Sequence, residues 1–315
     1  MTRIAVVGGY GVGLVFRVPR VPRAGETLVG EEFCIDHGGK GSNQAVGMAR
    51  LGAQVALLAA VGDDEFGRGA QELWRREGVR ATALVAAAPT MAGAILVEPT
   101  GENRIVIVPG ALAELRPAHV RGFAAEIAAA DVCVTGLEIP LETAVEALRV
   151  AREHGVATVL NPAPAPDRPL APELLALADH LTPNITELAR LTGPDGLEAA
   201  AVEQAARALA ERSGGVVTVT RGAAGALVMS HGVAVPVAAA RVAVVDTTGA
   251  GDAFTAAYAV AIAGGHGPVV AAGFACRAAG HAVRFAGVVP ALPRQRDLPD
   301  LPPPARAAIP TTSPA

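Results

Sequence analysis

The chain has 315 residues, of which 51% are hydrophobic, 18% charged and 3% aromatic, and its formal net charge is -4. This length is ample for a buried core, in one large domain or two modest ones. The composition excludes overall disorder, which requires low hydrophobicity and high net charge, and a slightly acidic chain without a basic run is a poor binder of nucleic-acid phosphates.

Short runs rich in Val, Ile and Leu alternate along the chain with longer runs rich in Ala, Glu and Arg. The short runs are apolar throughout, as expected of parallel strands that helices cover on both faces. The alternation predicts a three-layer α/β/α domain with a mostly parallel central sheet. The expected strands are Ile4–Val7, Val55–Ala60, Val132–Thr135, Val156–Leu160, His180–Pro183, Val216–Thr220 and Arg241–Val245. The expected helices are Asn43–Leu51, Phe66–Glu77, Leu141–Glu153, Leu197–Ser213, Gly251–Ala263 and Val269–Val283.

Two regions interrupt this alternation. Thr27–Asp36 has the composition of a strand, and Ala92–Val97 with Arg104–Val108 form a plausible hairpin. We expect strands from about residues 12–37 and 91–109 to form a small separate sheet inserted into the α/β domain. A small sheet over the edge of a larger one would act as a lid that excludes water from the chemistry beneath it.

The end of the chain differs in composition from the rest. Eight of the 24 prolines fall from Pro290 onward, and three consecutive prolines at 302–304 are compatible with neither a helix nor a central strand. We therefore expect a single domain over residues 1–300 and a Pro-rich, disordered tail over residues 301–315.

The expected location is the cytoplasm. The N-terminus lacks the apolar stretch and cleavage site of a signal peptide, and no run of about 18 apolar residues predicts a membrane span. Cys34, Cys133 and Cys276 are isolated and odd in number, which is typical of reduced thiols.

A glycine-rich segment, Gly8–Gly13, follows the first expected strand. Its place suggests a dinucleotide-binding turn. However, Phe16 stands where the third glycine should be, and Pro19 and Pro22 prevent the long helix that must follow. A dehydrogenase is therefore disfavoured, and a tight turn at the end of a strand explains the segment better.

The segment Gly38–Ala45 contains the only lysine of the chain, Lys40, against 25 arginines. Its glycines allow the backbone to lie against a ligand, and Ser42 or Asn43 could cap the next helix. A compact ammonium can donate to several hydroxyl groups in a space too tight for a guanidinium. The alternative is a glycine-rich turn with no ligand.

The segment Asp246–Phe254 precedes another expected helix. The backbone N–H groups of Gly249, Ala250 and Gly251 at a helix N-terminus would form an anion site. Asp252 beside it would repel a phosphate, which makes sense if this carboxylate removes a proton from an attacking hydroxyl group. The alternative is that Asp252 only stabilises the helix N-terminus.

Asn184 and Glu187 lie one helical turn apart after the expected strand His180–Pro183. Side chains at this spacing can hold hydrated Mg²⁺ near a phosphate. The same spacing also fits a capping box, which the sequence alone favours.

Together these segments resemble the ribokinase/PfkB-type carbohydrate kinase family, over roughly Ile4 to Pro290. Gly38–Ala45 and Asp246–Phe254 match its two long signatures. The resemblance implies a ribokinase-like fold with a β-sheet lid, often the contact of a homodimer. It also implies transfer of the γ-phosphate of ATP to a primary hydroxyl of a sugar or sugar-like acceptor, with Mg²⁺ and K⁺. Shorter motifs match in order at Gly25–Thr27, Val61–Asp64, Asn161–Ala165, Thr182–Asn184 and Thr220–Gly222.

The resemblance implies roles at matching positions. The general base would be Asp252, and the anion hole would be formed by Gly249, Ala250 and Gly251. Asn184 and Glu187 would orient Mg²⁺ and its waters. The acceptor-binding residues would be Gly39, Lys40, Asn43 and Glu138, beside Gly11 and Gly13. The nucleotide-binding residues would be Asn184, Thr220, Arg221, Gly222, Gly225, Gly251 and Cys276. The monovalent cation would be bound by Asp246, Thr248, Ala282, Phe285 and Gly287, mostly through backbone carbonyls.

Three positions depart from the family pattern. Members usually carry an acidic residue at the place of Gly13, an Asn at Gly11 and a polar residue at Leu112. Because specificity for polar substrates comes from paired buried groups, we expect an altered and roomier acceptor site that suits a larger or less polar acceptor such as a nucleoside. A catalytically silent ligand-binding or regulatory protein is the alternative from another class.

Overall fold

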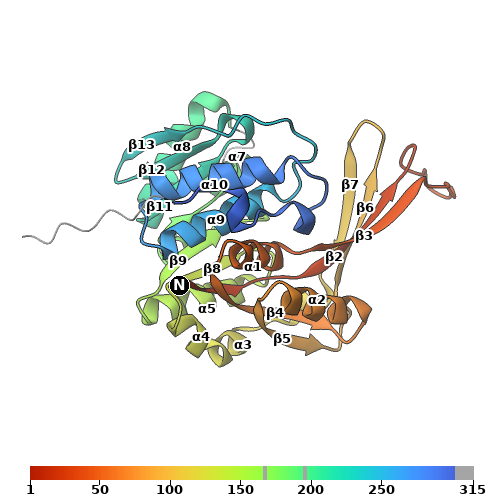
Figure 1. Ribbon diagram of the computed structural model, residues 1–315, viewed down its shortest axis with the longest axis horizontal. Coiled ribbons are helices and arrows are strands. Elements are labelled where there is room, and N and C mark those ends of the chain that lie inside the picture. Colours follow the sequence, from red (N-terminus) through yellow and green to blue (C-terminus); the bar gives the residue numbers. More distant parts are fainter. Residues whose placement is uncertain (166–168, 194–196, 302–315) are drawn as a thin grey trace, which may run out of the picture.

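The structure is a computed structural model that describes residues 1–165, 169–193 and 197–301. Nearly all of the expected tail, residues 302–315, lies outside the described residues. Figure 1 shows a large sheet with helices on both faces and a smaller sheet that stands at one side.

The large sheet has the strand order β13-β12-β11-β10-β9-β8-β1-β4-β5. All neighbours from β11 to β5 are parallel, and β12 and β13 add an antiparallel hairpin at one edge. The mostly parallel central sheet is confirmed. Its strands are β1 (Arg3–Val7), β4 (Gln54–Gly62), β5 (Arg80–Ala86), β8 (Val132–Gly136), β9 (Ala157–Asn161), β10 (His180–Leu181), β11 (Val216–Thr220), β12 (Ala226–Ser230) and β13 (Val233–Val237).

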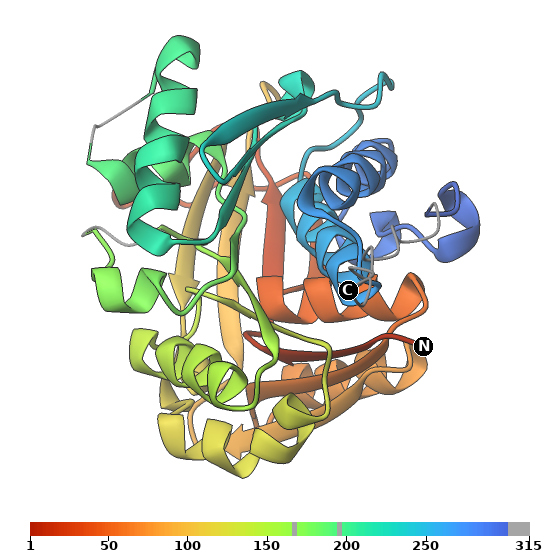
Figure 2. The ribbon, with the colours of Figure 1, turned by 90° about the vertical axis from the view of Figure 1, so that its left-hand side faces the viewer.

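Helices cover both faces of this sheet, so its strands alternate between two cores. Ile4 and Val6 of β1 pack into one hydrophobic cluster, and Ala5 and Val7 pack into another on the opposite face. Figure 2 shows the blue helices on one side of the sheet and the green helices on the other. The first face carries α1 (Lys40–Arg50), α2 (Glu65–Arg76), α9 (Ala250–Ala263) and α10 (Pro268–Ala282). The second carries α3 (Pro117–Gly122), α4 (Ala124–Ala128), α5 (Leu141–Glu153), α6 (Pro172–Leu175), α7 (Ile185–Thr192) and α8 (Val202–Ser213). Short 3₁₀ turns are η1 (Gly110–Glu114), η2 (Ala199–Ala201), η3 (Gly222–Ala224), η4 (Val289–Ala291) and η5 (Gln295–Asp297).

The small sheet that the sequence predicts is present. Its order is β3-β2-β6-β7, with β2 parallel to β6 and the outer pairs antiparallel. Two segments far apart in sequence therefore form one sheet, as Figure 1 shows. Its strands are β2 (Gly11–Arg17), β3 (Glu32–Gly38), β6 (Met91–Val97) and β7 (Asn103–Val108).

Several local predictions are wrong. Arg241–Val245 is not a strand: it pairs with no strand among the described residues, and the amides of Val245 and Asp246 both donate to the carbonyl of Val283, just past α10. The residues before Glu32 are also not part of β3. Strand β5 and the hairpin of β12 and β13 were not predicted from the sequence; the turn of that hairpin has a positive φ at Gly232.

The start of α1 is also corrected. The helix begins at Lys40 with Gly39 as its N-cap, so neither Ser42 nor Asn43 caps it. The Ser42 hydroxyl instead accepts a hydrogen bond from Trp74 Nε1 at 2.8 Å. In the described part of the chain, no helix is long and apolar enough to span a bilayer.

Candidate active site

The site residues gather at the carboxyl ends of the parallel strands. The chain runs from β1 outward to β4 and β5 and then returns to β8 on the other side of β1. Open α/β sheets bind ligands at such a switch point. Gly9, just after β1, donates its amide to Oε1 of Glu138, just after β8, at 2.8 Å.

Glu138 ties the glycine-rich segments together. Its Oε1 also accepts from the amide of Gly41 at 2.6 Å, and its Oε2 accepts from the amide of Lys40 at 2.8 Å. Burial raises the pKa of Glu138, although these amides pull it down. A Cβ on Gly41 would lie 2.5 Å from the Cα of Gly8, so the two segments pack backbone against backbone.

Asp252 lies in the first turn of α9 and is buried, with 7% of its surface exposed. Asn43 Nδ2 donates to its Oδ2 at 2.9 Å, and Gln44 Nε2 donates to its Oδ1 at 3.1 Å. Both oxygens are therefore oriented by neutral amides of α1. The Asn43 Oδ1 atom is buried and has no hydrogen-bond partner among the described residues.

The start of α9 offers the expected backbone donors only in part. Gly249 is the N-cap with φ 78°, and a Cβ there would lie 2.6 Å from Val288 Cγ1. The amide of Ala250 bonds to the Thr247 carbonyl at 3.3 Å, whereas no bond is recorded for the amides of Gly249 and Gly251 within the described ranges. Gly251 faces open space. The helix N-terminus thus presents two free amides to an anion.

Lys40 extends into a cluster of carboxylates. Burial is the largest single influence and lowers its pKa, but the charges of Asp252, Glu138 and Glu187 together raise the pKa above its ordinary value. Lys40 makes no ion pair within 4.0 Å in the part of the chain that the structure describes. A charged ammonium held among carboxylates without a direct partner is available to a ligand.

Asn184 and Glu187 form the capping box that the sequence favoured. Asn184 Oδ1 accepts from the Glu187 amide at 2.7 Å, and Glu187 Oε2 accepts from the Asn184 amide at 2.8 Å. Burial raises the pKa of Glu187, and the Asp252 carboxylate adds to this, against the Lys40 charge and the Asn184 amide. Although Glu187 is part of the capping box, it is close enough to Asp252 and Lys40 for their charges to shift its pKa.

The expected nucleotide-binding residues lie next to Asn184. Thr220 ends β11 and forms a parallel bridge with Asn184. After it, Gly222 and Gly225 both have positive φ, and a Cβ on Gly225 would lie 2.0 Å from the Val237 carbonyl oxygen. On α10, burial raises the pKa of Cys276 to about 11, partly offset by the charges of Arg277 and Arg221. The structure therefore brings Asn184 beside Thr220, and Arg221 close enough to Cys276 for its charge to lower that pKa.

Asp246 organises the loop expected to bind a monovalent cation. Its Oδ1 accepts from the Thr248 amide at 2.9 Å, and its Oδ2 accepts from the Gly287 amide at 3.1 Å. Burial raises the pKa of Asp246, but these amides outweigh it and hold the pKa below its usual range. The carbonyl of Ala282 accepts from the Phe285 amide at 3.2 Å nearby. The five predicted residues thus lie in two adjoining segments, 246–248 and 282–287, the second of which begins at the last residue of α10.

The expectation of a roomier acceptor site fails at Gly11. A Cβ on Gly11 would lie 2.3 Å from Met91 Cε, so the Met91 side chain fills that space. At Gly13 the nearest atom to such a Cβ is Ile95 Cδ1, at 3.1 Å. Leu112 is buried and lies beside Gly9. Compared with the family pattern, these three positions are therefore less polar, but they do not leave additional empty space.

A network of buried amide side chains behind Asp252 was not predicted from the sequence. Gln44 Nε2 also donates to Asn161 Oδ1 at 3.1 Å, and Asn161 Nδ2 donates to the Thr182 carbonyl at 3.0 Å. Gln44, Asn161 and Thr182 stood within matched motifs. Their polarity amid apolar neighbours was the signal that could have found them, because buried polar groups need partners.

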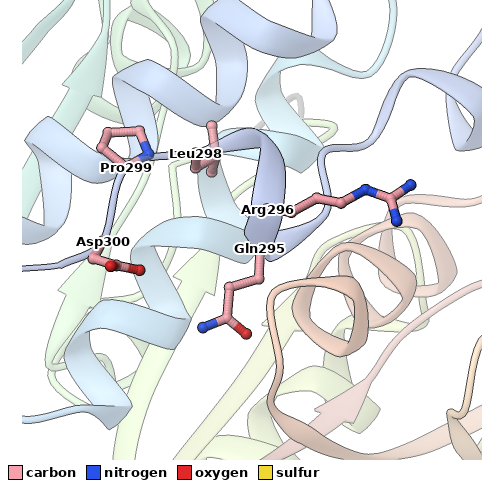
Figure 3. A pocket seen from close by; sticks show the side chains of 5 residues that line it. All are labelled: Gln295, Arg296, Leu298, Pro299 and Asp300. Carbon is pink, nitrogen blue, oxygen red and sulfur yellow. The ribbon is translucent and has the colours of Figure 1, made fainter.

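A surface pocket lies elsewhere on the molecule (Figure 3). A Cβ on Gly52, just past the end of α1, would lie 2.9 Å from Gln295 Oε1 of this pocket. Lys40 is at the other end of α1, about 16 Å away for 11 residues at 1.5 Å each. The pocket therefore does not belong to the candidate active site. Its lining residues are Gln295, Arg296, Leu298, Pro299 and Asp300.

The chain is similar to known proteins in sequence and fold. A profile of the pfkB family carbohydrate kinases matches residues 1–295. Ribokinase of Bacillus subtilis (strain 168) is 38% identical over 303 residues, covering 96% of this chain and 99% of that one. Deoxyribokinase of Salmonella typhi is 37% identical over 258 residues, covering 81% and 84%. A structure of Arabidopsis thaliana ribokinase complexed with ribose and ATP has a TM-score of 0.85 at 29% identity, covering 94% and 97%.

Proposed function

The chain belongs to the PfkB family of carbohydrate kinases, which transfer a phosphoryl group to a hydroxyl group, and we propose that it phosphorylates a primary hydroxyl of a sugar with ATP as donor. The observation that carries the proposal is Asp252, a buried carboxylate held by two amides beside unpaired backbone N–H groups. The similarity to a ribokinase complexed with ribose and ATP supports this choice of substrates.

In the proposed reaction Asp252 is the general base. It accepts the proton of the acceptor hydroxyl as that oxygen attacks the γ-phosphorus of ATP in line. The free amides of Gly249 and Gly251 donate to the phosphoryl oxygens, where negative charge develops. Lys40 binds the acceptor, and its positive charge offsets that of the surrounding carboxylates.

The residues present are compatible with the cations that we propose. Mg²⁺ often binds through few carboxylates together with substrate phosphates and waters, and Glu187 has one oxygen, Oε1, outside the capping box. When bound, Mg²⁺ would neutralise charge on the phosphates. Among the described residues, no group of three or more His, Cys, Asp or Glu side chains could hold a metal ion directly.

The monovalent cation is proposed at the loop of Asp246. Hard cations prefer carboxylate and carbonyl oxygens, and Asp246 brings the 246–248 segment against the 282–287 segment where such carbonyls lie. A cation there would act indirectly, by fixing the loop that continues into Gly249. Asp246 would hold the same loop through its two backbone hydrogen bonds.

We favour a monosaccharide acceptor over a nucleoside. The nucleoside hypothesis depended on space at Gly11 and Gly13. Met91 fills the space at Gly11, and Ile95 Cδ1 would lie 3.1 Å from a Cβ on Gly13. The test measures ADP release with ribose, 2-deoxyribose and adenosine, each with and without K⁺. Turnover of a pentose supports the proposal, turnover of adenosine alone replaces it with a nucleoside kinase, and acceptor binding without any turnover favours the catalytically silent alternative.

We also propose a homodimer through the outer face of the small sheet. In one row across the sheet, Ile35 lies opposite Leu14, Leu14 opposite Ala94, and Ala94 opposite Val106. Ile35 is 51% exposed and Val106 is 67% exposed, and contiguous exposed apolar patches often mark interfaces. Sedimentation should report a dimer for the unaltered chain and a monomer for Val106→Asp; a monomer for both would refute this interface.

A further inference from the structure

Asp36 lies directly opposite Gly13 in the small sheet. The antiparallel register pairs Gly13 of β2 with Asp36 of β3, and on the other side the parallel register pairs Gly13 with Gly93 of β6. Directly opposed residues share a face of a sheet. Asp36 therefore stands at one end of a row in which the next two strands, at Gly13 and Gly93, carry no side chain. Among the described residues, only Ile95 Cδ1, at 3.1 Å, and Val15 Cγ2, at 3.9 Å, lie within 4 Å of a Cβ built on Gly13.

This face of the sheet points toward the catalytic loops. His37 faces the other way, because its Nδ1 lies 2.7 Å from Tyr10 Oη and its ring lies near Gly69 of α2. Successive residues of a strand point to opposite faces, so Asp36 points away from α2. Arg17 shares the face of Gly13, and its charge reaches the Asp246 carboxylate.

Asp36 is chemically free to bind a ligand. Its side chain is half-buried, and its one recorded polar contact among the described residues is the Cys34 thiol, 3.9 Å from Oδ2. It makes no ion pair in those same ranges. The neighbouring positions Gly11 and Gly13 have no side chain that could bind a hydroxyl group. The side chains beside the glycine loops, Met91 and Leu112, are apolar.

We propose that Asp36 reaches across Gly13 from the neighbouring strand and accepts hydrogen bonds from hydroxyl groups of the acceptor. An ionised carboxylate is an acceptor with two oxygens, suited to a pair of neighbouring hydroxyls. Asp36 precedes Lys40 by four residues, so one segment would supply both an anion and a cation to the same sugar. This inference rests on the proposed function and makes Asp36 a specificity-determining residue of the acceptor site.

The test measures kcat and KM for the unaltered chain, Asp36→Asn and Asp36→Ala with ribose, 2-deoxyribose and 3-deoxyribose. Losing a hydrogen bond to a charged group should raise the KM for ribose at least about tenfold, while the KM for ATP stays unchanged. The preference for ribose over the deoxy sugar that lacks the contacted hydroxyl should disappear in Asp36→Ala. Glu32→Gln is the matched control, because Glu32 lies on the same face of β3 but pairs with Arg17.

Exchanging the residues at positions 13 and 36 distinguishes acceptor binding from a purely structural effect. A Cβ on Gly13 meets only Ile95 Cδ1 closely, at 3.1 Å, so Gly13→Asp combined with Asp36→Gly should restore the preference for ribose. Sugar preferences that are the same in all variants would overturn the inference while leaving the proposed function standing. No turnover of any sugar by the unaltered chain would overturn both.

Discussion

Replacing Asp252 with Asn removes the proposed base while leaving the shape of the site intact. In the unaltered chain, Asp252 accepts from Asn43 Nδ2 and Gln44 Nε2. An Asn at position 252 can still accept a hydrogen bond from Gln44 through its amide oxygen. Its amide nitrogen would then face Asn43 Nδ2, and two donors cannot bond to each other. Because Asn43 Oδ1 has no partner in the described part of the chain, the Asn43 amide can turn over and accept that new bond.

The expected effects on stability and on rate are therefore very different. A rearranged hydrogen bond should cost no more than about 1 kcal/mol, a fall in Tm of about 4 °C at most. Loss of a general base should lower kcat about 10²- to 10⁴-fold, equivalent to about 2.7–5.4 kcal/mol of transition-state stabilisation. The KM for ATP should change little, because the proposed role of Asp252 is to accept a proton from the acceptor hydroxyl and not to bind ATP.

The assay follows ADP release at saturating sugar and ATP, with Tm measured on the same samples. Asp179→Asn is the matched control. Asp179 accepts from the amide of Thr158 at 2.9 Å. It lies just before β10, at the amino ends of the parallel strands, whereas the candidate site lies at their carboxyl ends. This control should lose stability but keep its kcat. A kcat for Asp252→Asn close to that of the unaltered chain, or a loss of kcat equal to that of the control, would refute the assignment.

Two further predictions concern the surroundings of the base, and a third concerns a buried ion pair at the far end of α1. Lys40→Arg keeps the charge among the three carboxylates but not the compact shape, so the KM for the sugar should rise about tenfold or more without a change in the KM for ATP; an unchanged sugar KM would show that Lys40 does not touch the acceptor. Asp246→Ala frees the amides of Thr248 and Gly287, so kcat should fall at least about tenfold and no longer respond to K⁺; a normal K⁺ response would place the cation elsewhere. Glu77 pairs with Arg50 at 2.8 Å with both side chains less than 10% exposed, and the hydrogen bond from Arg50 holds the pKa of Glu77 below its usual range. Glu77→Gln should therefore cost about 3 kcal/mol near neutral pH. Because a lowered carboxyl pKa contributes stability that is lost as pH falls through it, this difference should shrink below about pH 4; urea unfolding with an equal deficit at neutral and acid pH would contradict this.

The sequence by itself determined the main architecture and marked the segments that form the candidate site. Apolar runs such as Ile4–Val7 require cover on both faces, which leaves few arrangements other than a parallel sheet between helices. Gly39 and Gly249 have positive φ, a conformation that glycine adopts without strain. Glycine in the sequence therefore indicated both turns before the structure was known. The capping box of Asn184 and Glu187 is equally local, since both partners lie within one helical turn.

The tertiary structure alone decided which distant side chains meet. Gln44 and Asp252 are 208 residues apart, and their hydrogen bond exists only because α1 and α9 pack side by side. The absence of a strand at Arg241–Val245 also follows from its surroundings, because the segment runs past the end of α10 with no strand beside it.

Position 13 shows the same division most clearly. The sequence displays a glycine where an acidic side chain is expected, and only the register of β2 against β3 and β6 shows what stands beside it. A shift of that register by one residue would turn Asp36 to the other face of the small sheet. Local composition carries no information about register, which depends on contacts between segments that are far apart in the chain.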